Sequence, residues 1–191
     1  MERSPDATVR SNAVIALGDM AVCFNHLIDE NTDFLYRRLA DDDASVKRTC
    51  LMTLTFLILA GQVKVKGQLG EMAKCMEDED RRIADLARMF FTELSTKDNA
   101  VYNHFVDMFS LLSAGDMQEE SFRKIIRFLL GFVEKDKHAK QLAEKLAARL
   151  SRVENERQWN DVAFALGILQ HKNEEITKLV SEGYKVIQSS A

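Results

Sequence analysis

Apolar side chains return along this chain in a pattern that repeats every 37 residues. Each clear copy has an aspartate, then Val or Ile three residues later, then a small apolar residue after four more: Asp6, Val9 and Ala13; Asp43, Val46 and Cys50; Asp80, Ile83 and Ala87. A period of about 20 to 50 residues is typical of a unit that stacks on its neighbours to bury an apolar face. The pattern therefore predicts a helical repeat array.

The repeat continues beyond the third copy, with one copy spaced 39 rather than 37 residues from the preceding one. Phe122, Ile126 and Leu129 return 37 residues later as Trp159, Ala163 and Leu166, whereas the step from Ile83 to Phe122 is 39 residues. Copies of one helix should start near residues 6, 43, 80, 120 and 158, with a second segment of helical periodicity between them. We expect a single domain of helical hairpins near 1–24, 31–60, 68–95, 99–133 and 138–170, followed by a terminal helix at 173–189.

The repeated aspartate predicts a helix cap. Its carboxylate can accept hydrogen bonds from the first free backbone N–H groups of the following helix. Arg10 and Lys47 lie four residues after Asp6 and Asp43, where they can pair with a carboxylate of their own unit or of the next. The alternative is that these bases line a groove and meet a ligand. Ala84 takes the basic position in the third copy, and this favours the ladder of ion pairs.

Composition supports helix almost everywhere. The 191 residues are 46% hydrophobic and 29% charged, with one proline and eight glycines. The longest weakly polar run, 50–63, is too short to cross a bilayer. The three cysteines, Cys23, Cys50 and Cys75, fall on predicted apolar faces and are expected as reduced, packed thiols. The first hairpin would expose an apolar face, so we expect the chain to be a piece of a longer protein.

Positive charge is concentrated in one stretch of this acidic chain, whose net charge is −4. Residues 44–70 hold Lys47, Arg48, Lys64 and Lys66 and no acid. Such a patch attracts phosphate or an acidic partner. Lys64 and Lys66 are expected on a connector between helices that Gly67 allows to turn. The candidate binding residues are Lys64, Lys66, Gly67, Gln68, Lys47, Arg48, Arg37 and Arg38.

Signatures of catalysis are missing from the sequence. It holds no glycine-rich phosphate loop, no HExxH, no GxSxG and no zinc-type spacing of Cys and His. The acidic runs at 41–43 and 77–80 stand at the repeat turn, where capping explains them better than cation binding. We therefore expect no enzyme activity, no cofactor, no metal and no small-molecule substrate.

Three strings of residues resemble the condensin complex subunit 1 family over about residues 8–112. They begin at Val9-Arg10-Ser11-Asn12, at Val63-Lys64-Val65-Lys66-Gly67-Gln68, and at Phe90-Phe91-x-Glu93-Leu94-Ser95-x-Lys97. The repeat alone indicates only HEAT repeats, and the last two strings single out this family. The resemblance implies the C-terminal HEAT region of that subunit, with an all-α HEAT-repeat solenoid of about five hairpins.

The resemblance further implies a non-catalytic scaffold in mitotic chromosome condensation, located in the nucleus on chromosomes with a cytoplasmic pool. Its expected partners are the ATPase head of an SMC subunit and the kleisin subunit, with possible contact to double-stranded DNA and none to membrane. The Lys64–Gln68 connector becomes the expected contact element. Two alternatives stay open: a general HEAT adaptor or transport-type module, and an autonomous DNA-binding module.

Overall fold

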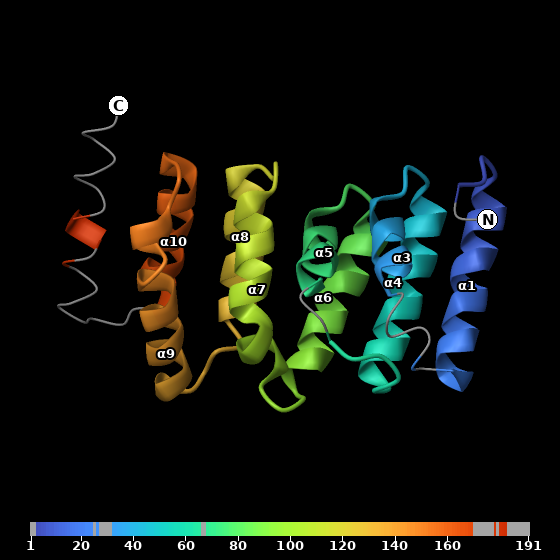
Figure 1. Cartoon of the computed structure of the whole chain (residues 1–191), viewed down its shortest axis with the longest axis horizontal. Helices are drawn as coiled ribbons and strands as arrows, with labels where there is room; N and C mark the ends of the chain where they lie inside the picture. Colours follow the sequence, from blue (N-terminus) through green and yellow to red (C-terminus); the bar gives the residue numbers. More distant parts are fainter. Residues whose placement is uncertain are drawn as a thin grey trace. The chain divides into compact units, whose positions relative to one another are not determined.

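The computed structural model describes residues 3–24, 26, 32–65, 68–169, 178 and 180–182, and every regular element among them is helical (Figure 1). Contacts divide the chain into two compact units, Met1–Asp98 and Asn99–Ala191. In each unit, helical hairpins follow one another along the chain. The prediction of an all-α repeat fold is therefore confirmed.

The first unit alternates short and long helices. The long helices are α1 (Ala7–Cys23), α4 (Ala44–Leu59) and α6 (Arg81–Ser95). The short ones are α3 (Asp33–Arg37) with η1 (Arg38–Ala40), and α5 (Leu69–Lys74) with η2 (Cys75–Glu77). α4 packs between α1 and α6, while η1 and η2 pack on α4 and α6 respectively. The long helices begin within a residue or two of the predicted positions.

The repeated aspartates cap the long helices as predicted. The side chains of Asp6, Asp43 and Asp80 each accept a backbone N–H from the residue two positions later, at 2.8 Å. All three lie in extended backbone immediately before the helix. This arrangement satisfies donors that have no partner inside the helix.

A ladder of ion pairs joins consecutive repeats. Arg10 binds both carboxylate oxygens of Asp41 at 2.9 Å, and Lys47 binds Asp78 at 2.5 Å. Each of these aspartates also accepts the backbone N–H of the capping aspartate two residues later, at 3.0 and 2.9 Å. In each acidic run, the aspartate two residues before the capping aspartate thus receives the base of the preceding repeat. The interpretation of these bases as a ladder of ion pairs is confirmed, and each base pairs with a carboxylate of the next repeat rather than of its own.

Close packing of α1 against α4 depends on Gly18. A Cβ at this position would lie 2.6 Å from Cγ2 of Thr53. Val14, Gly18 and Ala21 are the buried residues of α1, one or two helical turns apart. Small side chains on this face therefore let the two helices approach each other.

The second unit consists of α7 (Ala100–Ala114), α8 (Glu119–Leu130), α9 (Asp136–Ala147), η3 (Leu150–Arg152) and α10 (Glu156–Leu169). α10 packs against α7, α8 and α9. Phe109 of α7 and Phe122 of α8 meet edge to face, with ring centroids 5.6 Å apart. Fully buried aromatic rings thus form the centre of this unit.

The last copy of the repeat differs from the predicted register. Phe122, Ile126 and Leu129 are fully buried, but their predicted counterparts Trp159, Ala163 and Leu166 are only half-buried. The buried residues of α10 are Asp161, Val162 and Ala165. Asp161 faces inward because it accepts hydrogen bonds from Ser113 and Arg157, at 2.7 and 3.0 Å. The predicted terminal helix at 173–189 lies almost entirely outside the described residues.

Candidate functional site

The connector between α4 and α5 starts from a fixed end. Gly61 has φ of +69°, a conformation that side chains with a Cβ rarely adopt. The backbone N–H groups of Gly61 and Gln62 donate to Ile58 and Leu57, at 3.0 and 2.9 Å. Val63 then buries its side chain, which is 4% exposed. The chain is therefore anchored immediately before Lys64.

Lys64 itself is exposed, and the far end of the connector is held as well. The side-chain amide of Gln68 donates to the carboxylate of Asp33 at the start of α3. Lys66 and Gly67 lie outside the described residues. Lys64, directly after the buried Val63, can present a cation to a partner with little loss of freedom on binding.

A further cation, Lys97, lies at the same edge of the first unit. Its ammonium donates to the carbonyl oxygen of Leu59 at 2.9 Å, at the C-terminal end of α4. α4 and α6 both end at this edge (Figure 1). Sequence reasoning did not include Lys97 among the candidates. Its place in the third string of the resemblance was the signal that pointed to it.

The predicted basic patch of residues 44–70 is divided by α4. Lys47 and Arg48 lie in its first two turns, whereas Lys64 follows its last turn. With a rise of about 1.5 Å per residue, α4 extends over roughly 16 Å from Arg48 to Leu59, so Lys47 and Arg48 lie well away from Lys64. The expectation of one patch is therefore wrong, because adjacency in sequence was taken for adjacency in space.

The remaining candidate cations have neighbours within the first unit. Lys47 pairs with Asp78, and Arg38 binds the carboxylate of Asp41 at 3.0 Å. The hydrogen bond to Asp78 raises the pKa of Lys47. Arg37 lies over the ring of Phe34, with 5.1 Å from its guanidinium carbon to the ring centroid. Lys47 and Arg38 thus serve internal contacts, and Arg48 is half-exposed on α4.

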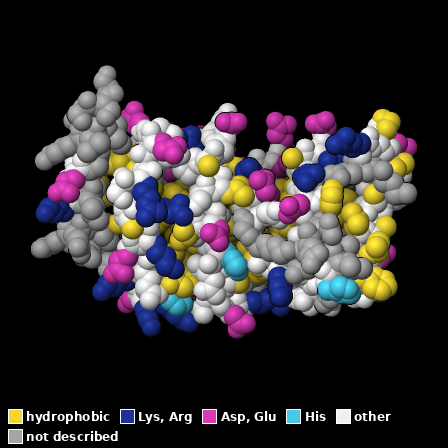
Figure 2. Space-filling model, in the orientation of Figure 1, with side chains coloured by type: hydrophobic (Ala, Val, Ile, Leu, Met, Phe, Trp, Pro, Cys, Tyr) yellow, Lys and Arg dark blue, Asp and Glu magenta, His cyan; other side chains and the backbone are white. Residues whose placement is uncertain are grey.

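An exposed apolar row crosses the long helices of the first unit. Ile15, Met52 and Met89, one repeat apart, are 48%, 56% and 51% exposed. Phe56, one turn beyond Met52, is 60% exposed. Hydrophobic side chains also gather over α1 (Figure 2). Such exposed rows are typical of protein-binding surfaces. Sequence reasoning missed the row because it searched the periodic apolar positions for the core alone.

The described residues offer little for covalent or metal chemistry. No group of three or more His, Cys, Asp or Glu side chains among them could hold a metal ion. Burial raises the pKa of the Cys50 and Cys75 thiols, and this disfavours the reactive thiolate. Cys23 is exposed, so the expectation that it is packed on an apolar face is wrong. No helix in the described part of the chain is long and apolar enough to cross a membrane.

Comparison with known proteins finds relatives over nearly the whole chain. The chain is 62% identical over 190 residues to Condensin complex subunit 1 of Saccharomyces cerevisiae, covering 99% of this chain and 16% of that protein. It is 57% identical to the Schizosaccharomyces pombe protein of the same name, covering 96% and 16%, and 41% identical to the Homo sapiens one, covering 94% and 13%. The chain thus spans about a sixth of the length of the first two relatives.

The family model described as non-SMC mitotic condensation complex subunit 1 matches residues 8–167. This range includes residues of both units and extends from the second residue of α1 to Gly167 near the end of α10. The chain therefore belongs to the family of the non-SMC mitotic condensation complex subunit 1.

Proposed function

We propose that this chain is a non-catalytic HEAT-repeat scaffold of condensin that docks on the ATPase head of an SMC subunit and on the kleisin subunit. On this proposal it acts on chromosomes in the nucleus during mitotic condensation. Membership of the family supports the condensin role. The observation that carries the docking role is the anchored connector, with exposed Lys64 between buried Val63 and the Gln68–Asp33 contact.

Docking needs both contact area and a means of orientation, and the first unit offers each. The row formed by Ile15, Met52 and Met89 supplies exposed apolar area on three successive helices. Lys64 supplies a charge, and electrostatic complementarity governs orientation and association rate more than total affinity. A scaffold of this kind needs no reacting side chain.

The connector can be tested by removing its charges. With Lys64→Ala/Lys66→Ala, we expect binding to the SMC head and kleisin to weaken by about tenfold, because two charge contacts are lost. The measurement is titration of the labelled head–kleisin complex with the 191-residue chain. Lys137→Ala/Lys140→Ala removes the same charge from exposed positions of α9 and serves as the control. Undiminished binding by the connector variant would remove the connector from the interface.

Direct binding to duplex DNA through phosphates is a second candidate, favoured by the exposed cations Lys64, Arg81 and Arg82. The sequence pI of about 5.6 works against strong autonomous binding. Binding through phosphates weakens with salt by a log–log slope of about −0.9 for each contact. If DNA causes no signal change even at about 50 mM salt, this candidate is excluded for the chain.

A further inference from the structure

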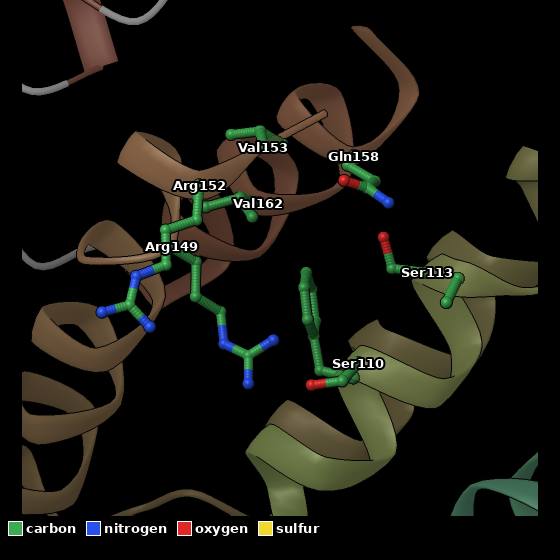
Figure 3. Close-up of a pocket in the computed structure, with 9 residues that line it drawn as sticks. Ser110, Ser113, Arg149, Arg152, Val153, Gln158 and Val162 are labelled. Carbon is green, nitrogen blue, oxygen red and sulfur yellow. The ribbon is translucent and has the colours of Figure 1, made fainter. Parts of the chain in front are cut away.

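The second unit contains a hollow of about 390 Å³ among α7, η3 and α10 (Figure 3). This volume lies within the range of about 300 to 1,000 Å³ that is typical of ligand sites. On the apolar side it is lined by Phe109, Val153 and Val162, and on the polar side by Arg149, Arg152 and Gln158. The hollow is separate from the connector, which belongs to the first unit.

Of the neutral polar side chains around the hollow, Ser110 and Ser113 use their O–H groups within the protein, whereas Gln158 keeps a donor. The hydroxyl of Ser110 donates to the carbonyl of Val106 at 2.6 Å, and that of Ser113 donates to Asp161 at 2.7 Å. The carbonyl oxygen of Gln158 accepts the backbone N–H of Glu154 at 3.1 Å, which leaves its NH2 group as a donor. Figure 3 shows the Gln158 side chain facing the hydroxyl of Ser113.

The two arginines add positive charge to the lining of the hollow. Neither Arg149 nor Arg152 forms an ion pair with any residue that the structure describes. Asp161 is buried behind the hollow and is already bound by Ser113 and by Arg157, whose guanidinium also donates to the carbonyl of Met117 at 3.1 Å. One of the two guanidinium groups extends into the space between η3 and α7 (Figure 3). The hollow therefore favours a negatively charged ligand group that accepts hydrogen bonds.

The apolar wall decides what kind of anion fits. Phe109 and Val162, which are only 2% and 3% exposed, form the floor of the hollow together with the half-buried Val153. Phosphates of nucleic acid would satisfy the guanidinium groups but would make no apolar contact with this floor. A peptide can place an apolar side chain on the floor and adjacent carboxylates on the arginines, whose planar forks match carboxylate geometry.

We propose that this hollow binds a linear segment of a partner protein in which an apolar side chain stands next to acidic residues. Arg149 and Arg152 bind the carboxylates, the NH2 group of Gln158 donates to the peptide backbone, and Phe109, Val153 and Val162 receive the apolar side chain. The site is a second docking point, independent of the connector.

The test is a nuclear magnetic resonance titration of the isotope-labelled 191-residue chain with a short peptide of repeated Phe-Asp-Glu units. We expect saturable shifts at Val153, Val162 and Gln158, and affinity about tenfold weaker with Arg149→Ala/Arg152→Ala, because two charge-assisted contacts are lost. Lys137→Ala/Lys140→Ala should bind as well as the unsubstituted chain. Thermal unfolding of each variant verifies that it is folded.

Two comparison probes complete the test. A peptide in which Lys replaces Asp and Glu should not bind, and a short DNA duplex should leave the three reporter residues unchanged. The proposal is overturned if the arginine variant binds the acidic peptide with full affinity, or if the shifts lie outside the hollow. Equal binding of the lysine peptide, or a stronger response to DNA, would also overturn it.

Discussion

Phe91→Ala is expected to lower the free energy of unfolding of the first unit by about 4 kcal/mol, the usual cost of removing a buried aromatic side chain. Phe91 is fully buried in α6 and meets Phe90 edge to face, with centroids 5.0 Å apart. It occupies the repeat position of Leu17 and Leu54. Its removal leaves a cavity between stacked helices that the close-packed core cannot fill. Chemical denaturation followed by circular dichroism measures the effect.

Two control variants separate the loss of buried packing from the mere loss of a phenylalanine ring. Phe56→Ala removes the same ring from an exposed position and should change stability by less than about 0.5 kcal/mol. Phe91→Leu restores the residue type of the two preceding repeats and should cost only about 1 to 1.5 kcal/mol. If Phe91→Ala were as mild as Phe56→Ala, the stacked core would not be the source of stability.

Asp41→Ala is expected to lower the free energy of unfolding of the first unit by about 2 kcal/mol. This lies between the values for breaking exposed and fully buried ion pairs. The Asp41 side chain is 3% exposed and accepts hydrogen bonds from Arg10, Arg38 and the backbone of Asp43. Its loss leaves these donors without their acceptor and breaks the ladder between two repeats. The same denaturation experiment measures this effect. Asp42→Ala, an exposed neighbour, should be nearly neutral.

The ladder also predicts a dependence on pH. Burial alone would raise the pKa of Asp41, but the hydrogen bonds from Arg10 and Asp43 and the charges of Arg10 and Arg38 hold it below the ordinary value of 3.8. The stability that ionised Asp41 contributes to the fold is therefore complete above pH 3.8. It is lost as the pH falls through the lowered pKa of Asp41 in the folded protein. Asp41→Asn should be less stable at neutral pH and should lose less stability below this point. A parallel acid response of both proteins would contradict the role given to Asp41.

Local chemistry made the first unit predictable from the sequence. Capping by Asp6, Asp43 and Asp80 needs only a carboxylate and the N–H groups two or three residues away, so the repeat pattern predicted it. The partners of Arg10 and Lys47 were left open between their own unit and the next, because pairing across 31 residues depends on how the hairpins stack.

The errors share a physical cause. The register of α10 was wrong because Asp161 turns inward to meet Ser113, a preference that a search for apolar residues ignores. Lys47 and Lys64 were assigned to one patch because they share a stretch of sequence without an acid, although α4 separates them in space. The hollow at Arg149 was missed because its lining comes from three separate segments, and no single stretch of sequence holds its pattern.

The most direct test of the docking role is photo-crosslinking in the assembled condensin complex, with and without ATP, from a photoreactive residue placed at position 64. We expect crosslinks to the SMC head or to kleisin from this position, and none from the same residue placed at position 137. Absence of crosslinks from position 64, or identical products from both positions, would contradict the docking role.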